Sequence, residues 1–195
     1  MRTVRSLLLL PALLLFLAAC SPAPSKDDFA YANAPFTANV RGTYTSGDGV
    51  PHPITARITV GESLAQDAPA ARPITVVFTA PETLAGITVE AIYTTDADGH
   101  IRRTVTFSYP SPYGEVTASS GSSGMDGLLR FAEALLPVGD IVSVSPTAED
   151  GTHTVTRATA DGAREAIFLF SSEQALPLRV SVQEKGETLE LIITP

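Results

Sequence analysis

Several common sources of stability and binding are missing from this chain. With one cysteine in 195 residues, no disulfide bond can form within a single copy. Tryptophan is absent, and aromatic residues make up only 7% of the sequence. Acidic residues outnumber basic residues by 21 to 13, which gives a formal net charge of −8. This charge argues against a nucleic-acid partner and against electrostatic adhesion to anionic lipid headgroups.

The chain also has no apolar run long enough to cross a bilayer. The run from Leu7 to Ala19 is shorter than the roughly 20 residues that a membrane-spanning helix needs. Arg2 and Arg5 precede this run, and small residues end it. A basic start, a short apolar core and a small-residue end are typical of an export signal. We therefore expect residues 1–19 to be a signal peptide.

The signal ends in Leu17-Ala18-Ala19-Cys20, which resembles the lipobox of bacterial lipoproteins. In that family the cysteine receives a lipid and becomes the first residue of the mature protein. Random placement of the only cysteine at this position would occur in about one sequence in two hundred. Two or more acyl chains such as palmitate anchor a protein stably. The resemblance implies a lipoprotein anchored through Cys20 at the extracytoplasmic face of the cell membrane; the alternative is an ordinary secretory signal with a stray cysteine.

Beyond the signal, the chain divides into a tether and a single domain. Residues 20–33 are rich in Ser, Pro, Ala and Asp and have no apolar periodicity, so we expect a lipidated cysteine and a flexible tether. Residues 34–195 have the length of one domain.

Within this domain, alternation of apolar and polar residues predicts about nine or ten β-strands. Turn residues separate the strands, with 15 Pro and 14 Gly in the whole chain. The predicted strands are 36–44, 54–60, 74–80, 87–93, 101–109, 141–144, 152–159, 164–170, 178–182 and 189–193.

One helix interrupts the strands. Apolar residues recur at spacings of three and four between Met125 and Leu136, which is typical of an amphipathic helix. Pro137 and Gly139 end it. Residues 119–124, Ser-Ser-Gly-Ser-Ser-Gly, precede the helix and are predicted to be a flexible linker.

The order of these elements resembles a known family. After the lipobox come a strand pair from Phe36, a strand break at residues 81–86, the helix, and Leu176-Pro177-Leu178 before the last hairpin. This order resembles the short Gram-positive lipoproteins that share the fold of the lipoprotein-carrier (LolA/LolB-like) superfamily. The resemblance implies a mainly β (α+β) fold, in which a strongly curved antiparallel sheet forms a half-barrel with one amphipathic helix across its concave face.

The same resemblance implies a cavity for acyl chains, so a lipid or another apolar ligand is the expected partner. The other expected role is that of an accessory module of the cell envelope. The strand faces carry more apolar surface than one short helix covers. The candidate cavity residues are Phe36, Val40, Tyr44, Ile58, Val76, Phe78, Val89, Val105, Met125, Leu128, Leu129 and Leu136. An alternative that the sequence leaves open is a two-sheet, immunoglobulin-like sandwich for adhesion or assembly.

Catalytic chemistry is not apparent in the sequence. His52, His100 and His153 lie in separate predicted loops or on exposed strand faces without metal-ligand spacing, and are interpreted as solvated. No nucleophile, acid–base pair or metal-ligand set stands out. We expect a non-enzymatic protein that uses no metal and no cofactor.

The lipobox interpretation makes a direct prediction. Cys20→Ala removes the acyl acceptor, so the variant should be released into the medium or remain unprocessed. Cell fractionation and the mass of the protein measure both outcomes. A variant that stays membrane-bound at the mature size of the wild type would contradict lipidation of Cys20.

Overall fold

The computed structural model describes residues 28–63, 72–95, 98, 101–111, 114–120 and 126–194. These residues form eleven strands, the 3-10 helix η1 (Ala30–Asn33) and the α-helix α2 (Asp126–Glu133). The strands are β1 (Phe36–Thr45), β2 (Pro51–Val60), β3 (Ile74–Ala80), β4 (Thr88–Thr95), β5 (Ile101–Ser111), β6 (Gly114–Ser120), β7 (Asp140–Val144), β8 (Thr152–Ala158), β9 (Arg164–Ser171), β10 (Arg179–Glu184) and β11 (Glu187–Thr194). No helix in the described ranges is both long and apolar enough to cross a membrane.

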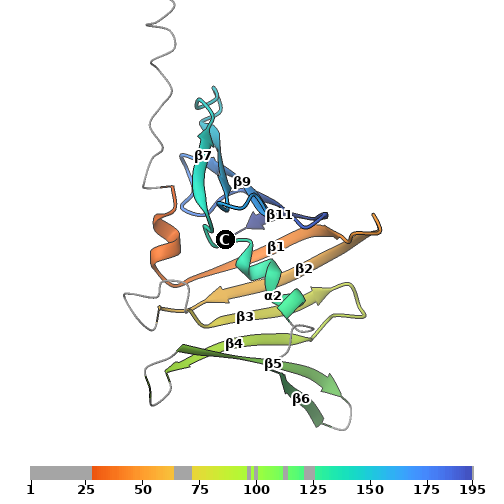
Figure 1. Ribbon diagram of the computed structural model, residues 1–195. Coiled ribbons are helices and arrows are strands. Elements are labelled where there is room, and N and C mark those ends of the chain that lie inside the picture. The colour runs from red at the N-terminus through yellow and green to blue at the C-terminus, as the bar shows by residue number, and fades with distance from the viewer. Residues whose placement is uncertain are drawn as a thin grey trace, which may run out of the picture.

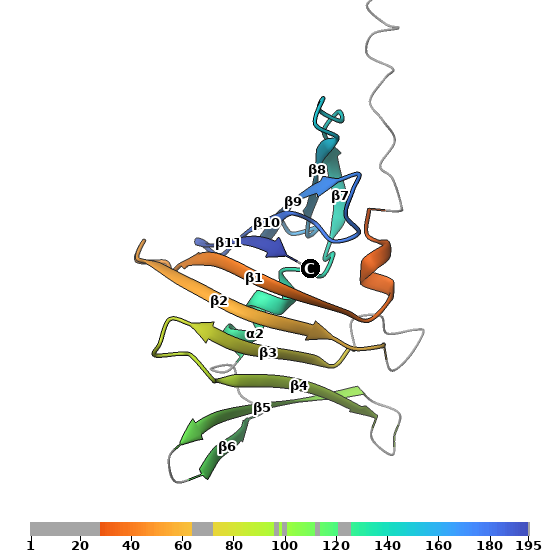
Figure 2. The same cartoon turned by 180° about the vertical axis from the view of Figure 1, so that it is seen from behind.

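All eleven strands belong to one antiparallel sheet with the order β6-β5-β4-β3-β2-β1-β11-β10-β9-β8-β7. Two meanders, β1–β6 and β7–β11, meet where β1 pairs with β11. The sheet curves strongly, so that β7–β9 stand at a steep angle to β1–β4 (Figure 1, Figure 2). The predicted half-barrel is confirmed, and the two-sheet sandwich is wrong because a single sheet contains every described strand.

Gly42 lies where the two meanders join. It pairs with Leu191 across the β1–β11 seam. A Cβ atom on Gly42 would lie 1.9 Å from the backbone oxygen of Glu190 and 2.8 Å from a side-chain carbon of Leu191. Glycine in a strand commonly marks a tight bend or a close backbone approach. The missing side chain at Gly42 therefore allows the two halves to meet this closely.

The concave face of the sheet carries the hydrophobic core. Side chains alternate between the two faces of each strand, so that Val40 is buried while the adjacent Arg41 is exposed. The largest fully buried side chains are Phe78, Phe168, Ile58, Ile74, Leu129, Leu135, Leu191, Val40, Val60, Val76, Val89 and Val155. Isolated apolar side chains such as Ile192 stay exposed on the convex face.

Helix α2 lies on one face of the sheet, where it contacts β2, β3 and β4 (Figure 1, Figure 2). Its segment connects β6, at one edge of the sheet, with β7 at the other. The helix is shorter than the predicted 125–136, because 3-10 hydrogen bonds from the N–H groups of Leu135 and Leu136 replace the helical pattern. Gly139 follows with a φ of +82°, a backbone conformation that favours glycine.

Aspartates hold several of the predicted turns. In the β1–β2 turn, Oδ1 of Asp48 accepts a hydrogen bond from the N–H of Val50 at 3.1 Å. In the β8–β9 turn, Oδ1 of Asp161 accepts one from the N–H of Ala163, also at 3.1 Å. Together with hydrogen bonds from neighbouring hydroxyl groups, these contacts lower the pKa of both carboxyl groups below the usual range.

The prediction missed strand β6. The predicted strand over 101–109 is followed by no further strand, and residues 119–124 are predicted as a linker, whereas β6 covers Gly114–Ser120. Pro110 lies within β5, beyond Ser108, which is the last residue of β5 that pairs with β4. Its missing N–H therefore interrupts no ladder bond on that side.

The predicted tether also ends too late. Residues 28–33 belong to the folded domain, because Phe29 and Tyr31 are both only 8% exposed within the core. Their aromatic rings occupy apolar surface that the strands alone leave uncovered.

Burial of α2 can be tested with one substitution. Leu129 is fully buried, so Leu129→Ala should lower the free energy of unfolding by about 2–5 kcal/mol. Ile192→Ala is the matched control, because Ile192 is 51% exposed and its loss should cost no more than about 0.5 kcal/mol. Equal denaturation midpoints for the two variants would place α2 outside the core.

Candidate functional site

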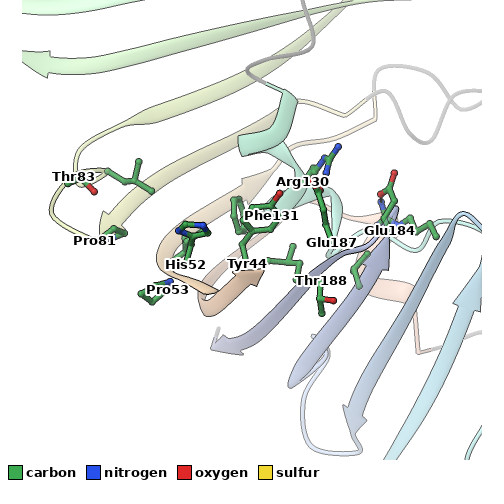
Figure 3. Close-up of a pocket in the computed structure, with 15 residues that line it drawn as sticks. Tyr44, His52, Pro53, Pro81, Thr83, Arg130, Phe131, Glu184, Glu187 and Thr188 are labelled. Carbon is green, nitrogen blue, oxygen red and sulfur yellow. Dashed lines mark hydrogen bonds and ion pairs between the residues drawn. The ribbon is translucent and has the colours of Figure 1, made fainter. Parts of the chain in front are cut away.

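A cavity of about 580 Å³ opens at one end of the half-barrel. Residues of α2 line it together with Thr83 of the β3–β4 turn and with residues at the starts of β2 and β11, such as His52 and Glu187 (Figure 3). The two sides of the cavity come from opposite halves of the curved sheet, so its shape depends on the pairing of β1 with β11.

Apolar side chains form most of the wall. Phe131 of α2 packs edge-on against Phe78 in the core at a ring-centroid distance of 5.9 Å. On its other side it packs edge-on against Tyr44 at 6.3 Å. The remaining apolar wall residues are Pro53, Ile54, Pro81, Leu84, Val182 and Leu189. An apolar cavity with a few charged groups is the usual form of a small-molecule site.

One ion pair joins α2 to β11 beside the cavity. Arg130 is paired with Glu187, and both residues line the cavity. Burial raises the pKa of the Tyr44 phenol, and its hydrogen bond to Glu187 raises this pKa further. The phenol thus remains a hydrogen-bond donor at neutral pH.

A second arginine, Arg164 at the start of β9, lines the same cavity. Its Nη2 donates a hydrogen bond to the backbone oxygen of Glu133 at 3.1 Å. Its Nη1 lies 3.8 Å from Oε2 of Glu184, which is too long for a hydrogen bond. Its Nε is buried and has no hydrogen-bond partner among the described residues. Arg164 therefore lines the cavity without a closely bound carboxylate among the described residues.

The opposite end of the half-barrel is closed by residues 28–34. Phe29 packs edge-on against Phe168 and Phe170 at centroid distances of 5.1 and 5.2 Å. The guanidinium carbon of Arg157 lies 4.9 Å from the centre of the Phe29 ring, which adds a cation–π contact. The hydroxyl of Tyr31 donates to the backbone oxygen of Leu135 at 2.6 Å and so connects this segment with the end of α2.

Arg72 also holds residues 28–34 in place, through hydrogen bonds to their backbone. Its Nε donates to the backbone oxygen of Gly61 at 2.8 Å, and its two Nη atoms donate to Ala32 and Ala34. Burial lowers the pKa of Arg72, but arginine remains charged under ordinary conditions. In these contacts backbone carbonyl dipoles stabilise the cation, and the hydrogen bonds to Ala32 and Ala34 fix residues 32–34 against the sheet.

His153 is not solvated as predicted. Its Nε2 lies 3.1 Å from Oδ1 of Asp28, and its ring stacks on Phe170 at 5.7 Å. The strand period could have shown this, because His153 lies two residues before the buried Val155 and thus on the same face. His52 lines the cavity and stacks on Tyr44 at 6.2 Å. His100 lies outside the described residues.

The structure places the predicted cavity residues at three kinds of position. Tyr44 lines the cavity. Phe36 and Leu136 are partly buried and pack against the core. The fully enclosed core contains Val40, Ile58, Val76, Phe78, Val89, Val105 and Leu129. Met125 and the side chain of Leu128 lie outside the described residues. The observed cavity therefore lies beside α2, at the end of the sheet, and not beneath the helix.

Sequence reasoning missed the charged groups of the cavity. These groups are Arg130, Arg164, Glu184 and Glu187. They belong to separate elements that only the curvature of the sheet brings together. In the described ranges, no group of three or more His, Cys, Asp or Glu side chains is placed to hold a metal ion.

No family model and no curated protein sequence matches the chain. Solved structures with a similar chain path include a LolA superfamily protein from Nitrosomonas europaea, with 13% identity and a TM-score of 0.44 over 87% of this chain and 88% of that chain. A DUF1329 family protein from Desulfovibrio piger has 11% identity and a TM-score of 0.40 over 88% of this chain and 91% of that chain. At these identities and TM-scores, the similarity does not assign the chain to a family.

The closed end of the half-barrel can be tested through Phe29. Phe29→Ala removes a buried ring from an aromatic cluster, so it should lower the free energy of unfolding by about 3–5 kcal/mol. Tyr109→Ala provides a control, since Tyr109 is 44% exposed and should cost little. Chemical denaturation measures both variants, and a neutral effect of Phe29→Ala would show that residues 28–34 do not belong to the cooperative fold.

Proposed function

We propose that the protein is a lipid-anchored lipoprotein of the extracytoplasmic face of the membrane and that it binds an apolar ligand in the cavity beside α2. The cavity is the observation that supports the binding role. Its walls are mostly apolar, and its volume is about 580 Å³. Small-molecule sites commonly measure roughly 300–1,000 Å³. The proposal assigns the protein binding and no catalysis.

The two ends of the half-barrel support this role. Strand β1 has ten residues, so it spans about 30 Å at the usual rise per residue. Its first residue, Phe36, packs against Tyr31 at the closed end, and Tyr44 near its last residue lines the cavity. A ligand that enters at the open end would thus meet a filled core instead of a channel through the sheet.

The anchor fits the same arrangement. Asp28, the first residue that the structure describes, contacts His153 at the closed end. A lipid on Cys20 would therefore tether the domain by the end that lies away from the cavity. The cavity would then remain accessible from the aqueous side of the envelope. The excess of acidic over basic residues, 21 to 13 in the whole chain, would also keep the domain off an anionic membrane surface.

A titration with a fluorescent fatty-acid probe tests the binding role. The purified protein carries Cys20→Ala, so that its own acyl chains do not compete with the probe. We expect saturable binding, which Leu84→Trp should weaken by about tenfold or more because Leu84 lines the cavity and the larger ring fills it. Thermal melts of both proteins show whether the variant remains folded.

Ile192→Trp is the matched control for this titration. It introduces the same ring on the convex face, where Ile192 is exposed, and should leave probe affinity unchanged. Absence of saturable binding by the parent protein would refute the ligand-binding role. Equal losses in the two tryptophan variants would show that the probe binds elsewhere.

A further inference from the structure

Arg164 is unusual among the charged groups at the cavity because it is mostly buried and only partly neutralised. Its side chain is 14% exposed. Its hydrogen bond to the backbone of Glu133 leaves Nε without a partner among the described residues, and the nearest carboxylate oxygen lies 3.8 Å from Nη1. Buried charged groups are normally paired and hydrogen-bonded. No carboxylate of the described residues is closely bound to Arg164.

Arg130 differs from Arg164 both in its exposure and in its pairing with a carboxylate. It makes a close ion pair with Glu187, and its side chain is 43% exposed. A ligand anion at Arg130 would have to displace a bound carboxylate and would compete with water. At Arg164 the donors are already shielded from solvent, so a charge-assisted hydrogen bond there is stronger than the same bond at the surface.

We propose that Arg164 binds the anionic headgroup of an amphiphile whose apolar tail occupies the cavity beside α2. This inference rests on the proposed ligand-binding function and adds the chemical class of the ligand: one apolar chain with a carboxylate or phosphate head. Guanidinium groups bind both kinds of head through several N–H donors. The apolar wall formed by Phe131, Val182 and Leu189 lies in the same cavity, so head and tail are bound by one continuous site.

The charges that face Arg164 set the strength of this site. Glu184 lies on β10 and competes with an incoming anion, but it is 28% exposed and held only at 3.8 Å. The carboxylate of Glu133 is occupied by Arg103 at 2.9 Å, and that of Glu187 by Arg130. When an anion binds, Glu184 turns toward solvent and Arg164 keeps its hydrogen bond to the Glu133 backbone.

The test compares three ligands with the same acyl chain, used below their micelle-forming concentrations. Oleate carries a carboxylate, oleoyl lysophosphatidate carries a phosphate, and monoolein carries an uncharged head. Displacement of the fluorescent probe from the Cys20→Ala protein gives their affinities. We expect at least one acidic ligand to bind about tenfold more tightly than monoolein, as for an added charge-assisted hydrogen bond. The tighter of the two acids indicates whether the head belongs to a fatty acid or to a phospholipid.

Arg164→Gln should abolish this acid preference, measured as the ratio of the affinities for the tighter acid and for monoolein. Arg57→Gln is the matched control, because it removes an arginine that is exposed on β2 and does not line the cavity. If Arg164→Gln does not fold, Glu184→Gln is the second variant. It removes the competing carboxylate and should tighten the binding of acidic ligands several-fold.

The outcomes separate this inference from the proposed function. Equal affinity of the parent protein for acidic and neutral ligands would overturn the inference and leave the binding role intact. The same conclusion follows if folded Arg164→Gln retains the acid preference, since Arg164 would then only hold the end of α2. Binding of no ligand would overturn both proposals.

Discussion

The pairing of β1 with β11 is the contact on which the rest of the structure depends. It joins residues near the two ends of the described chain, such as Asn39 and Thr194. Each meander has sequence-local pairings, and the seam joins the part of the core that α2 covers on β2, β3 and β4 to the part that Phe29 covers on β9. Since closing a long loop must precede such a contact, its formation is entropically costly. Gly42 allows the close backbone approach at the seam, where a Cβ atom would overlap the Glu190 carbonyl.

Much of this fold follows from the local pattern of the sequence. Ten of the eleven strands were predicted, because their two-residue alternation reflects burial on one face of the sheet. Strand β6 was missed because of Pro110. A proline interrupts a sheet only where a neighbouring strand needs its missing N–H, and the local sequence does not show which strands are neighbours. Phe29 and Tyr31 were assigned to a tether for a similar reason. Two aromatic residues in a polar segment show no periodicity, and only the aromatic cluster at the sheet end accounts for them.

The cavity was much less predictable than the strands. A curved sheet with one helix was expected to leave apolar surface uncovered, but most of the named residues are buried core. Which part of the concave face stays uncovered depends on the exact length of α2 and on residues 28–34, which fill one end. The ion-pair partners Arg130 and Glu187 are 57 residues apart, and the geometry that unites them comes from the curvature of the whole sheet. Periodicity within one strand contains no information about that curvature.

The cavity and the core therefore have the same origin, because few helices are available to cover the concave face. The concave face carries the apolar core of the described strands, whereas the chain provides one α-helix of eight residues and one 3-10 turn to cover it within the described ranges. Residues 28–34 cover one end through Phe29 and Tyr31, and α2 covers the middle through Leu129 and Phe131. At the other end the charged groups form a polar boundary around an apolar wall. Filling this end with another large side chain would add hydrophobic stability but would bury Arg164 with no space for an anion. The partly neutralised arginine and the unfilled apolar space each lower the stability of the fold. An acidic amphiphile in the cavity would offset both effects, because its head would pair with the arginine and its tail would fill the space.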